Sequence, residues 1–397
     1  NPMLAYYEAY ALSLAGEAYA SVLDNAAAMD PRYCFPNRLE DIAVLRFALE
    51  HNPVDGHAAY YLGNLLYDRK RYAEAGELWE RAARLLPVYP TVRRNLALYY
   101  FNKAHEPKRA YASLCEAYSL NEGDARVLLE LDQLARKLGE TPEQRLARLE
   151  QHFATVTLRD DLTTEYITLL NLLGQHEKAF TLTMNRQFHP WEGGEGRITT
   201  QYALALKQMA RQALAAGDPA KAADLLTQAL TFPHNLGEGK LEGAKDNDIH
   251  YLLGVAADMR GDGARARVCY ERAALGDEEP AGMMFYNDQP ADMILYQGLA
   301  LRALKQEERA NARFHKLLDY GEQHIFDDVK IDYFAVSLPD MQLFDDDLNA
   351  RNRAHCQYLI AMGCFGLGDM RRAKTALAET LRLDAAHPGA RILKAML

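Results

Sequence analysis

The stretch that decides the fold is AYYLGNLLYDRKRYAEAGELWERAARLLP, from Ala59 to Pro87. Small residues such as Gly63 and Ala75 stand where two helices would approach each other closely, and the large Tyr67 and Trp79 would fill the spaces between helices. Pro87 stops the second helix, because proline lacks the backbone N–H that a helix interior needs. The stretch therefore predicts two helices joined by a short turn.

The same pattern returns along the chain. A Leu or Tyr followed by a small residue lies about twelve positions before each of seven alanines. These alanines are Ala75, Ala110, Ala179, Ala222, Ala266, Ala310 and Ala373. The pattern resembles the tetratricopeptide repeat (TPR), a helix–turn–helix unit of about 34 residues. The resemblance implies an all-α fold, a right-handed α-α superhelix in which each helix pair packs against the next.

Helix pairs are expected over most of the chain. The expected ranges are 4–29, 38–51 (a partial pair), 57–86, 91–120, 124–152, 160–188, 198–231, 248–275, 291–319 and 352–383, followed by a last helix that caps the array. No Ser/Gly linker divides them, so one continuous solenoid over 1–397 is expected. Within it, 1–55 is degenerate, 56–187 holds regular repeats, 188–350 holds repeats with long loops, and 351–397 holds the last repeat and the cap.

Long connections distinguish the C-terminal half. Ala75 and Ala110 are 35 residues apart, whereas Ala179 to Ala222 is 43, the next two intervals are 44, and Ala310 to Ala373 is 63. The extra residues form the loops 188–196, 233–248, 276–292 and 319–349, each after the second helix of a pair. Equivalent connections of a solenoid lie along one edge, so the four loops are expected to meet. Long loops that are rich in aromatic residues are typical of functional sites.

The composition excludes some partners. Lys and Arg total 45 against 55 Asp and Glu, a net charge of −10, so neither nucleic acid nor an anionic membrane surface is an expected partner. Hydrophobic runs are short and interrupted by charge, so no stretch is expected to cross a bilayer. The five cysteines form no CxxC pair, which favours free thiols in a reducing, cytoplasmic location.

The loop FHPWEGGEG (188–196) is the first candidate site. Trp191 lies beside Glu192, Glu195 and His189 in a glycine-rich segment, a combination that suits stacking on a sugar ring or contact with a cation. The alternative is that Trp191 packs its loop onto the edge of the solenoid. Both interpretations stay open at this point.

The loop 233–248 contains three glycines but matches no nucleotide-binding motif. A Walker loop would need Ser or Thr after Lys240, where Leu241 stands, and a Rossmann turn would need glycine in place of Glu242. Asp246 and Asp248 lack the rest of a calcium loop, and Asp248 is interpreted as the N-cap of the next helix. No cofactor and no metal ion are expected.

The longest loop, 319–349, is acidic. Seven aspartates lie between Asp327 and Asp347, and VKIDYFAVSLP in the same loop alternates like a strand, so a small hairpin or an extended segment is expected. The aspartates could bind a metal or a cationic partner, or supply a carboxylate to a glycosidase-like pair with a glutamate of another loop. The simpler interpretation is a solvated acidic lid in which Asp345–Asp347 cap the following helix. No known catalytic motif occurs, so whether the protein is an enzyme stays open.

A second resemblance covers most of the chain from about Phe35. The segments FHPWEGGEG, NLGEGKLEGAKDNDIHYLLG, NDQPADMILYQGLA and DDVKIDYFAVSLPD are similar to those of a family of large bacterial proteins. In that family a β-rich domain, similar to carbohydrate-binding or aldose-epimerase-like domains, precedes a C-terminal TPR array. The resemblance implies a missing N-terminal β domain and a link to carbohydrate. The family has no assigned activity, so no catalytic residue is carried over.

Two functional hypotheses follow, while a third, a purely structural spacer, is made unattractive by the four long loops. In the first, the chain is a protein-interaction scaffold, the C-terminal part of a larger protein, whose groove or loop edge docks a partner or its own N-terminal domain. In the second, the four loops form a carbohydrate-binding or carbohydrate-processing site. The candidate binding residues are His189, Trp191, Glu192, Glu195, His234, Asn235, Glu238, Lys240, Tyr286, Asp288, Asp332 and Tyr333. Convergence of these side chains on one pocket would favour the second hypothesis.

Overall fold

The fold is known from a computed structural model, which describes residues 1–191, 193–282, 289–330 and 343–397. The regular structure in these ranges consists of 21 α-helices and one short 3-10 helix, with no strand. This result confirms the all-α class and the TPR-like arrangement of helices that the sequence predicts. The expected hairpin falls mostly in 331–342, outside the described residues.

Contacts divide the described chain into two compact units. The first unit comprises Asn1–Leu138 together with Leu343–Asp345, and the second comprises the other described residues. The boundary therefore falls within the pair expected at 124–152, between its two helices. Leu343–Asp345 is a short non-helical segment that lies far along the chain from the rest of its unit.

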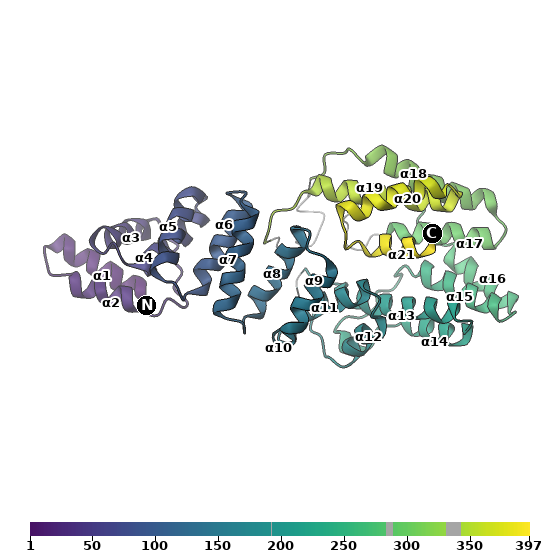
Figure 1. The fold of residues 1–397 in the computed structure, drawn as a ribbon, viewed down its shortest axis with the longest axis horizontal. Coiled ribbons are helices and arrows are strands. Elements are labelled where there is room, and N and C mark those ends of the chain that lie inside the picture. Colours follow the sequence, from purple (N-terminus) through teal and green to yellow (C-terminus); the bar gives the residue numbers. More distant parts are fainter. Residues whose placement is uncertain (192, 283–288, 331–342) are drawn as a thin grey trace. The chain divides into compact units, whose positions relative to one another are not determined.

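The first unit contains eight helices. They are α1 (Pro2–Ala15), α2 (Ala20–Ala28), α3 (Leu39–His51), α4 (Gly56–Asp68), α5 (Tyr72–Leu85), α6 (Pro90–Asn102), α7 (Pro107–Leu120) and α8 (Ala125–Lys137) (Figure 1). Helices α4 and α5 form one hairpin and α6 and α7 the next, and α5 packs against α6. This alternation of pairing within and between hairpins is the TPR pattern.

The second unit contains the remaining helices. They are α9 (Pro142–Gln151), α10 (Phe153–Val156), α11 (Asp160–Leu172), α12 (His176–Met184), α13 (Arg197–Ala215), α14 (Pro219–Ala229), η1 (His234–Leu236), α15 (Asn247–Met259), α16 (Gly263–Ala273), α17 (Ala291–Ala303), α18 (Glu307–His324), α19 (Leu348–Leu367), α20 (Met370–Leu383) and α21 (Pro388–Met396). Here too the second helix of one hairpin packs against the first helix of the next, as α16 does against α17.

The seven recurring alanines lie on α5, α7, α12, α14, α16, α18 and α20, the second helix of each pair. All of them are buried, with exposures of 0 or 1%. Gly63 of α4 lies at the contact with α5, since a Cβ at this position would lie 2.6 Å from the Trp79 ring of α5. A contact closer than about 3 Å forces the neighbouring atoms to shift, so a small residue is needed where α4 approaches α5.

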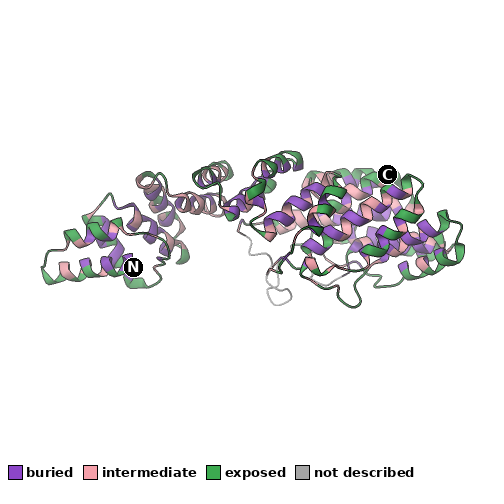
Figure 2. Cartoon of the chain, turned by 90° about the horizontal axis from the view of Figure 1, so that it is seen from below, coloured by how far each residue is buried: buried purple, intermediate pink, exposed green. Residues whose placement is uncertain are grey.

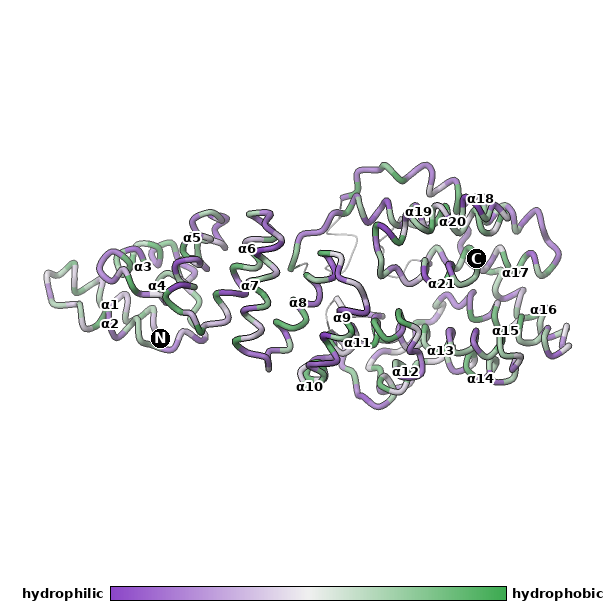
Figure 3. The backbone as a smooth tube through the Cα atoms, in the orientation of Figure 1, coloured by the Kyte–Doolittle hydropathy of each residue, from purple (hydrophilic) through white to green (hydrophobic). Residues whose placement is uncertain are grey.

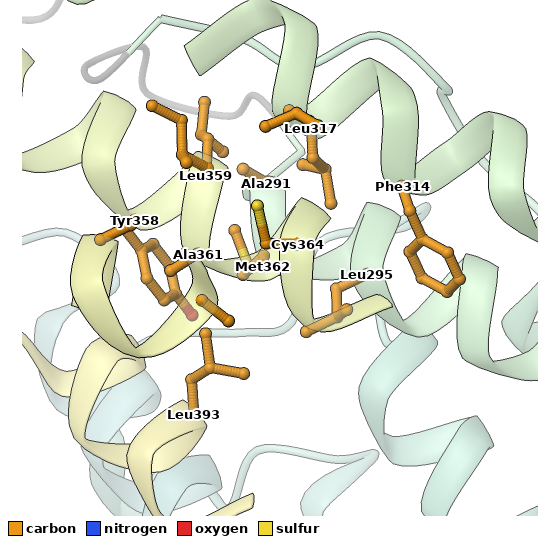
Figure 4. Packing of buried hydrophobic residues seen from close by; sticks show 14 of the residues in the cluster. Ala291, Leu295, Phe314, Leu317, Tyr358, Leu359, Ala361, Met362, Cys364 and Leu393 are labelled. Atoms are coloured by element: carbon orange, nitrogen blue, oxygen red, sulfur yellow. The ribbon is translucent and has the colours of Figure 1, made fainter. Parts of the chain in front are cut away.

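The core is distributed along the array. Helices such as α5 bury one side and expose the other (Figure 2), whereas α19 has no exposed residue, and apolar and polar residues mix along the trace (Figure 3). A large cluster in the second unit joins Leu295 of α17, Phe314 of α18, Met362 of α19 and Leu393 of α21 (Figure 4). The last helix α21 thus covers the end of the hydrophobic core, as a capping helix does.

Aspartates begin several helices. The side chains of Asp55, Asp124 and Asp347 accept a hydrogen bond from a backbone N–H in the first turn of α4, α8 and α19, respectively. The interpretation of Asp248 as an N-cap is wrong. Asp246 holds that position, and Asp248 lies inside α15, where it is buried and bonds to Lys207 of α13 at 2.5 Å. The Asp248 carboxylate, which the sequence assigns to capping, therefore forms an ion pair with the neighbouring helix α13.

Candidate functional site

Two of the predicted loops lie side by side. The backbone N–H of Phe188 donates to the carbonyl of Asn235 at 2.8 Å, and the N–H of Gly196 donates to the Glu238 carboxylate at 2.8 Å. Gly237 allows this approach, because it has a φ of +75° and a Cβ there would lie 2.6 Å from the Phe188 carbonyl oxygen. The structure therefore brings the loops 188–196 and 233–248 into direct contact.

The Asn235 side chain ties these loops to the helix before them. Its Nδ2 donates to the carbonyl oxygens of Thr183 and Arg186, both at 2.8 Å, at and just beyond the end of α12. Backbone carbonyls at a helix end have no partner within the helix, so an amide donor there stabilises the loop. Lys240 is also bound internally, at 2.7 Å from Asp246 and 5.3 Å from the centre of the Phe232 ring.

Glu238 is a half-buried acid of the loop 233–248. Gly196 bonds to one of its oxygens, while the other has no hydrogen-bond partner among the described residues. Burial raises the pKa of the Glu238 carboxyl, and the nearby charge of Glu195 raises it further. The Glu195 and His234 side chains are exposed.

His189 and Trp191 make contacts near their own loop. The backbone N–H and Nδ1 of His189 lie 3.0 and 3.1 Å from an oxygen of Asp160 in α11, and the His189 side chain is 78% exposed. Although burial opposes the shift, hydrogen bonds from Arg186 and His189 lower the pKa of the Asp160 carboxyl. The Trp191 ring lies against Gly194, where an added Cβ would be 1.9 Å from the ring. The ring thus packs within its own loop and is half-buried.

The described part of the third loop adjoins the second. Lys245 lies 3.6 Å from Asp277, and farther along the loop Glu278 pairs with Arg313 of α18. The His355 ring of α19 lies 3.1 Å from the carbonyl of Ala281. Five of the twelve candidate residues, Glu192, Tyr286, Asp288, Asp332 and Tyr333, lie outside the described residues. A common pocket of all four loops therefore stays a prediction.

Sequence reasoning missed a different cluster, at the end of α6. The Asn102 side chain makes two hydrogen bonds to the backbone of Leu343–Asp345, donating to the Leu343 carbonyl at 2.8 Å and accepting from the Asp345 N–H at 2.9 Å. The Phe344 ring packs edge-on against Phe101, with centroids 5.3 Å apart, and Phe344 is only 2% exposed. The first unit thus holds a bent three-residue segment by its backbone and by its central side chain.

Charged and aromatic groups surround this cluster. Lys103 Nζ lies 3.7 Å from the Asp345 carboxylate and 5.0 Å from the centre of the Tyr72 ring. Tyr72 contacts Tyr67, which in turn contacts the buried Trp79 of α5. The cluster at the end of α6 therefore adjoins the aromatic packing of the hairpin α4–α5. The sequence offered one signal, a Leu-Phe pair immediately before an aspartate run that was expected to be solvated.

In the second unit, hydrogen bonds also connect the first helices of different repeats. Arg211 of α13 donates to the Tyr296 hydroxyl of α17 at 2.6 Å, and the Tyr358 hydroxyl of α19 donates to Asp292 of α17 at 2.9 Å. These polar groups therefore bond to one another across repeats. A separate open pocket of about 340 Å³, lined by Phe153, Tyr166 and Lys178 among others, contains none of the twelve candidate residues.

No group of three His, Cys, Asp or Glu side chains that could hold a metal ion occurs among the described residues. No helix in the described ranges is long and apolar enough to cross a membrane.

The fold belongs to the class of TPR-like helical arrays. No protein-family model matches the sequence. Several solved structures align with this chain. One is YrrB, described as a TPR protein with an unusual peptide-binding site. It has 16% identity and a TM-score of 0.34, and the match covers 57% of this chain and 97% of that one. A TPR protein from Parabacteroides merdae has 13% identity and a TM-score of 0.32, and the match covers 75% of this chain and 99% of that one. A chain of the Naa15/Naa10 complex bound to HypK-THB has 14% identity and a TM-score of 0.40, and the match covers 89% of this chain and 58% of that one.

Proposed function

We propose that this chain is a protein-interaction scaffold that binds a short linear peptide of its partner at the end of α6. One observation carries the proposal, namely the two hydrogen bonds that the Asn102 amide makes with the backbone of Leu343–Asp345. An asparagine side chain has both a donor and an acceptor, so it can bond a carbonyl and an N–H of one peptide at the same time.

Backbone capture and a side-chain pocket together are the usual means of peptide recognition. Main-chain hydrogen bonds supply affinity for any sequence, and pockets for particular side chains supply specificity. Phe344 occupies such a pocket here beside Phe101. The resemblance to large bacterial proteins adds an N-terminal β domain of a longer protein to the partners worth testing.

The proposal is tested by selecting peptides from a random displayed library with the whole chain as bait. Selected peptides and a panel of oligosaccharides are then titrated by calorimetry. We expect peptides to bind, and Asn102→Ala to weaken that binding about tenfold or more, as loss of hydrogen bonds at a buried contact does. Asn185→Ala, at an exposed asparagine after α12, is the matched control and should change nothing.

Two outcomes would count against the proposal. Binding of oligosaccharides without any selected peptide would favour carbohydrate recognition by the loops. Peptide binding that survives Asn102→Ala would keep the scaffold but place its site elsewhere on the chain.

A further inference from the structure

We propose that Leu343–Asp345 is an internal ligand of the α6 site, and that a partner carrying a Phe–acidic peptide competes with it for that site. The inference rests on the proposed function and adds the chemical class of the partner. It follows from what each of the three residues contacts.

The three residues contact three different groups. Leu343 and Asp345 offer backbone groups to Asn102, Phe344 offers its ring to Phe101, and Asp345 offers its carboxylate to Lys103. Phe344 is buried, whereas the Asp345 side chain is 63% exposed. The buried aromatic residue is therefore the anchor of the segment, and the exposed ion pair contributes to choice of partner more than to affinity.

Asn102 distinguishes α6 from the neighbouring first helices of its unit. The last residues of α4, α6 and α8 are Asp68, Asn102 and Lys137. An aspartate carboxylate only accepts hydrogen bonds and a lysine ammonium only donates them, whereas an amide does both. Among these three positions, Asn102 is thus the one whose side chain can both donate to and accept from a peptide backbone, and it is the one that binds Leu343–Asp345.

The small size of this contact makes exchange possible. In the described part of the acidic loop, the three residues Leu343–Asp345 are the ones grouped with the first unit. A contact of this size is weak for separate molecules, but attachment to the same chain gives the segment an effective concentration on the order of 1 mM. The internal segment fills most of the sites. The apparent affinity of a competing peptide is therefore its intrinsic affinity multiplied by the fraction of sites that are empty.

The test measures binding of a fluorescein-labelled peptide with the sequence of residues 343–348, Leu-Phe-Asp-Asp-Asp-Leu, by fluorescence anisotropy. Phe344→Ala in the whole chain removes the anchor of the internal ligand. We expect this variant to bind the peptide at least about tenfold more tightly than the unchanged protein. Phe326→Ala is the matched control, because Phe326 lies in the same connection but is 88% exposed, and it should bind like the unchanged protein.

Further variants locate the binding and guard against misfolding. Adding Asn102→Ala to Phe344→Ala should remove the gain, and a peptide with alanine in place of phenylalanine should not bind. Asp345→Lys places a like charge beside Lys103 without opening a cavity, and should give a smaller gain. Circular dichroism checks that each variant keeps its helices.

The inference is overturned if the peptide binds Phe344→Ala and Asp345→Lys no better than the unchanged protein, or if adding Asn102→Ala to Phe344→Ala leaves the gain in binding intact. If library-selected peptides still depend on Asn102 while Leu-Phe-Asp-Asp-Asp-Leu does not bind, only this inference fails. If no peptide binds at all, the proposed function fails with it.

Discussion

Asn102 shows how much depends on one side chain of a repeat. Repeat periodicity reports residues that pack between helices, and Asn102 lies at the end of α6, where the pattern is free to vary. The two backbone bonds that it makes join residues 241 and 243 positions apart. No local pattern could reveal them. The net charge of −10 also gave no indication of a local cation, Lys103, which lies beside Asp345 of the bound segment.

Gly63 was correctly predicted as a close helix contact, and it gives the first stability test. We predict that Gly63→Leu lowers stability by about 2 kcal/mol or more, since overpacking displaces backbone. The cause is the Trp79 ring, which lies 2.6 Å from the position of an added Cβ. Urea unfolding checks the change in midpoint. Gly123→Ala in the same unit is the control, because its nearest neighbour would be at 3.5 Å. Equal midpoints for both variants would contradict the assigned contact.

Glu238 predicts a pH dependence of stability. Its folded-state pKa is raised by burial above the ordinary value of 4.5, so the folded protein binds more protons than the unfolded chain above that value. Stability is therefore lost as pH rises from about 4.5 through the raised pKa, and the loss persists above it. We expect Glu238→Gln to melt at a higher temperature than the unchanged protein at pH 8, and at the same temperature at pH 4.

The control for this experiment is Glu242→Gln, an exposed glutamate of the same loop, which should leave the melting temperature unchanged at both pH values. A difference between Glu238→Gln and the unchanged protein that is equal at pH 4 and pH 8 would show that charge on Glu238 is not the cause.

At the scale of elements, the helices were more predictable than the loops. Buried alanines about twelve residues after a Leu or Tyr and a small residue indicate the hairpins α4–α5, α15–α16, α17–α18 and α19–α20, because each hairpin must repeat the same contact. Loop contacts have no such constraint. The contact between 188–196 and 233–248 follows from their equivalent places in successive repeats, but the bonds of Asn235 to the end of α12 depend on one amide and one turn.

Asn235 tests this loop contact. We predict that Asn235→Ala lowers stability by about 2 kcal/mol, since the carbonyls of Thr183 and Arg186 lose their donor. Hydrogen exchange should also quicken at Phe188, whose N–H donates to the carbonyl of residue 235. The neighbouring His234→Ala is the control, because His234 is exposed. Unchanged exchange at Phe188 in Asn235→Ala would mean that the two loops hold together without this amide.

At the scale of the whole molecule, the division into two units was not visible in the sequence. No linker marks the boundary, and the repeat spacing continues across it. The sequence predicts a single array over 1–397, and the repeats do follow one another along the chain. What the spacing could not show is that Leu343–Asp345 packs with the first unit although the helices before and after it belong to the second.

This assignment predicts where the effect of Phe344→Ala will be found. Loss of a buried ring should loosen the first unit around α6, by about 2 kcal/mol or more in local opening. Hydrogen exchange should therefore quicken in α6 and leave α20 unchanged. Quicker exchange in α20 with no change in α6 would place the Phe344 side chain in the wrong unit.

The central claim is that α6 binds a short peptide now represented by the chain's own Leu343–Asp345. Hydrogen exchange of the unchanged protein, with and without an excess of the peptide Leu-Phe-Asp-Asp-Asp-Leu, tests it most directly. We predict quicker exchange at Asp345, whose N–H loses its bond to Asn102, while exchange within α6 stays as slow as before. Unchanged exchange at Asp345, or protection that appears in the loops 188–196 and 233–248 instead, would contradict the account.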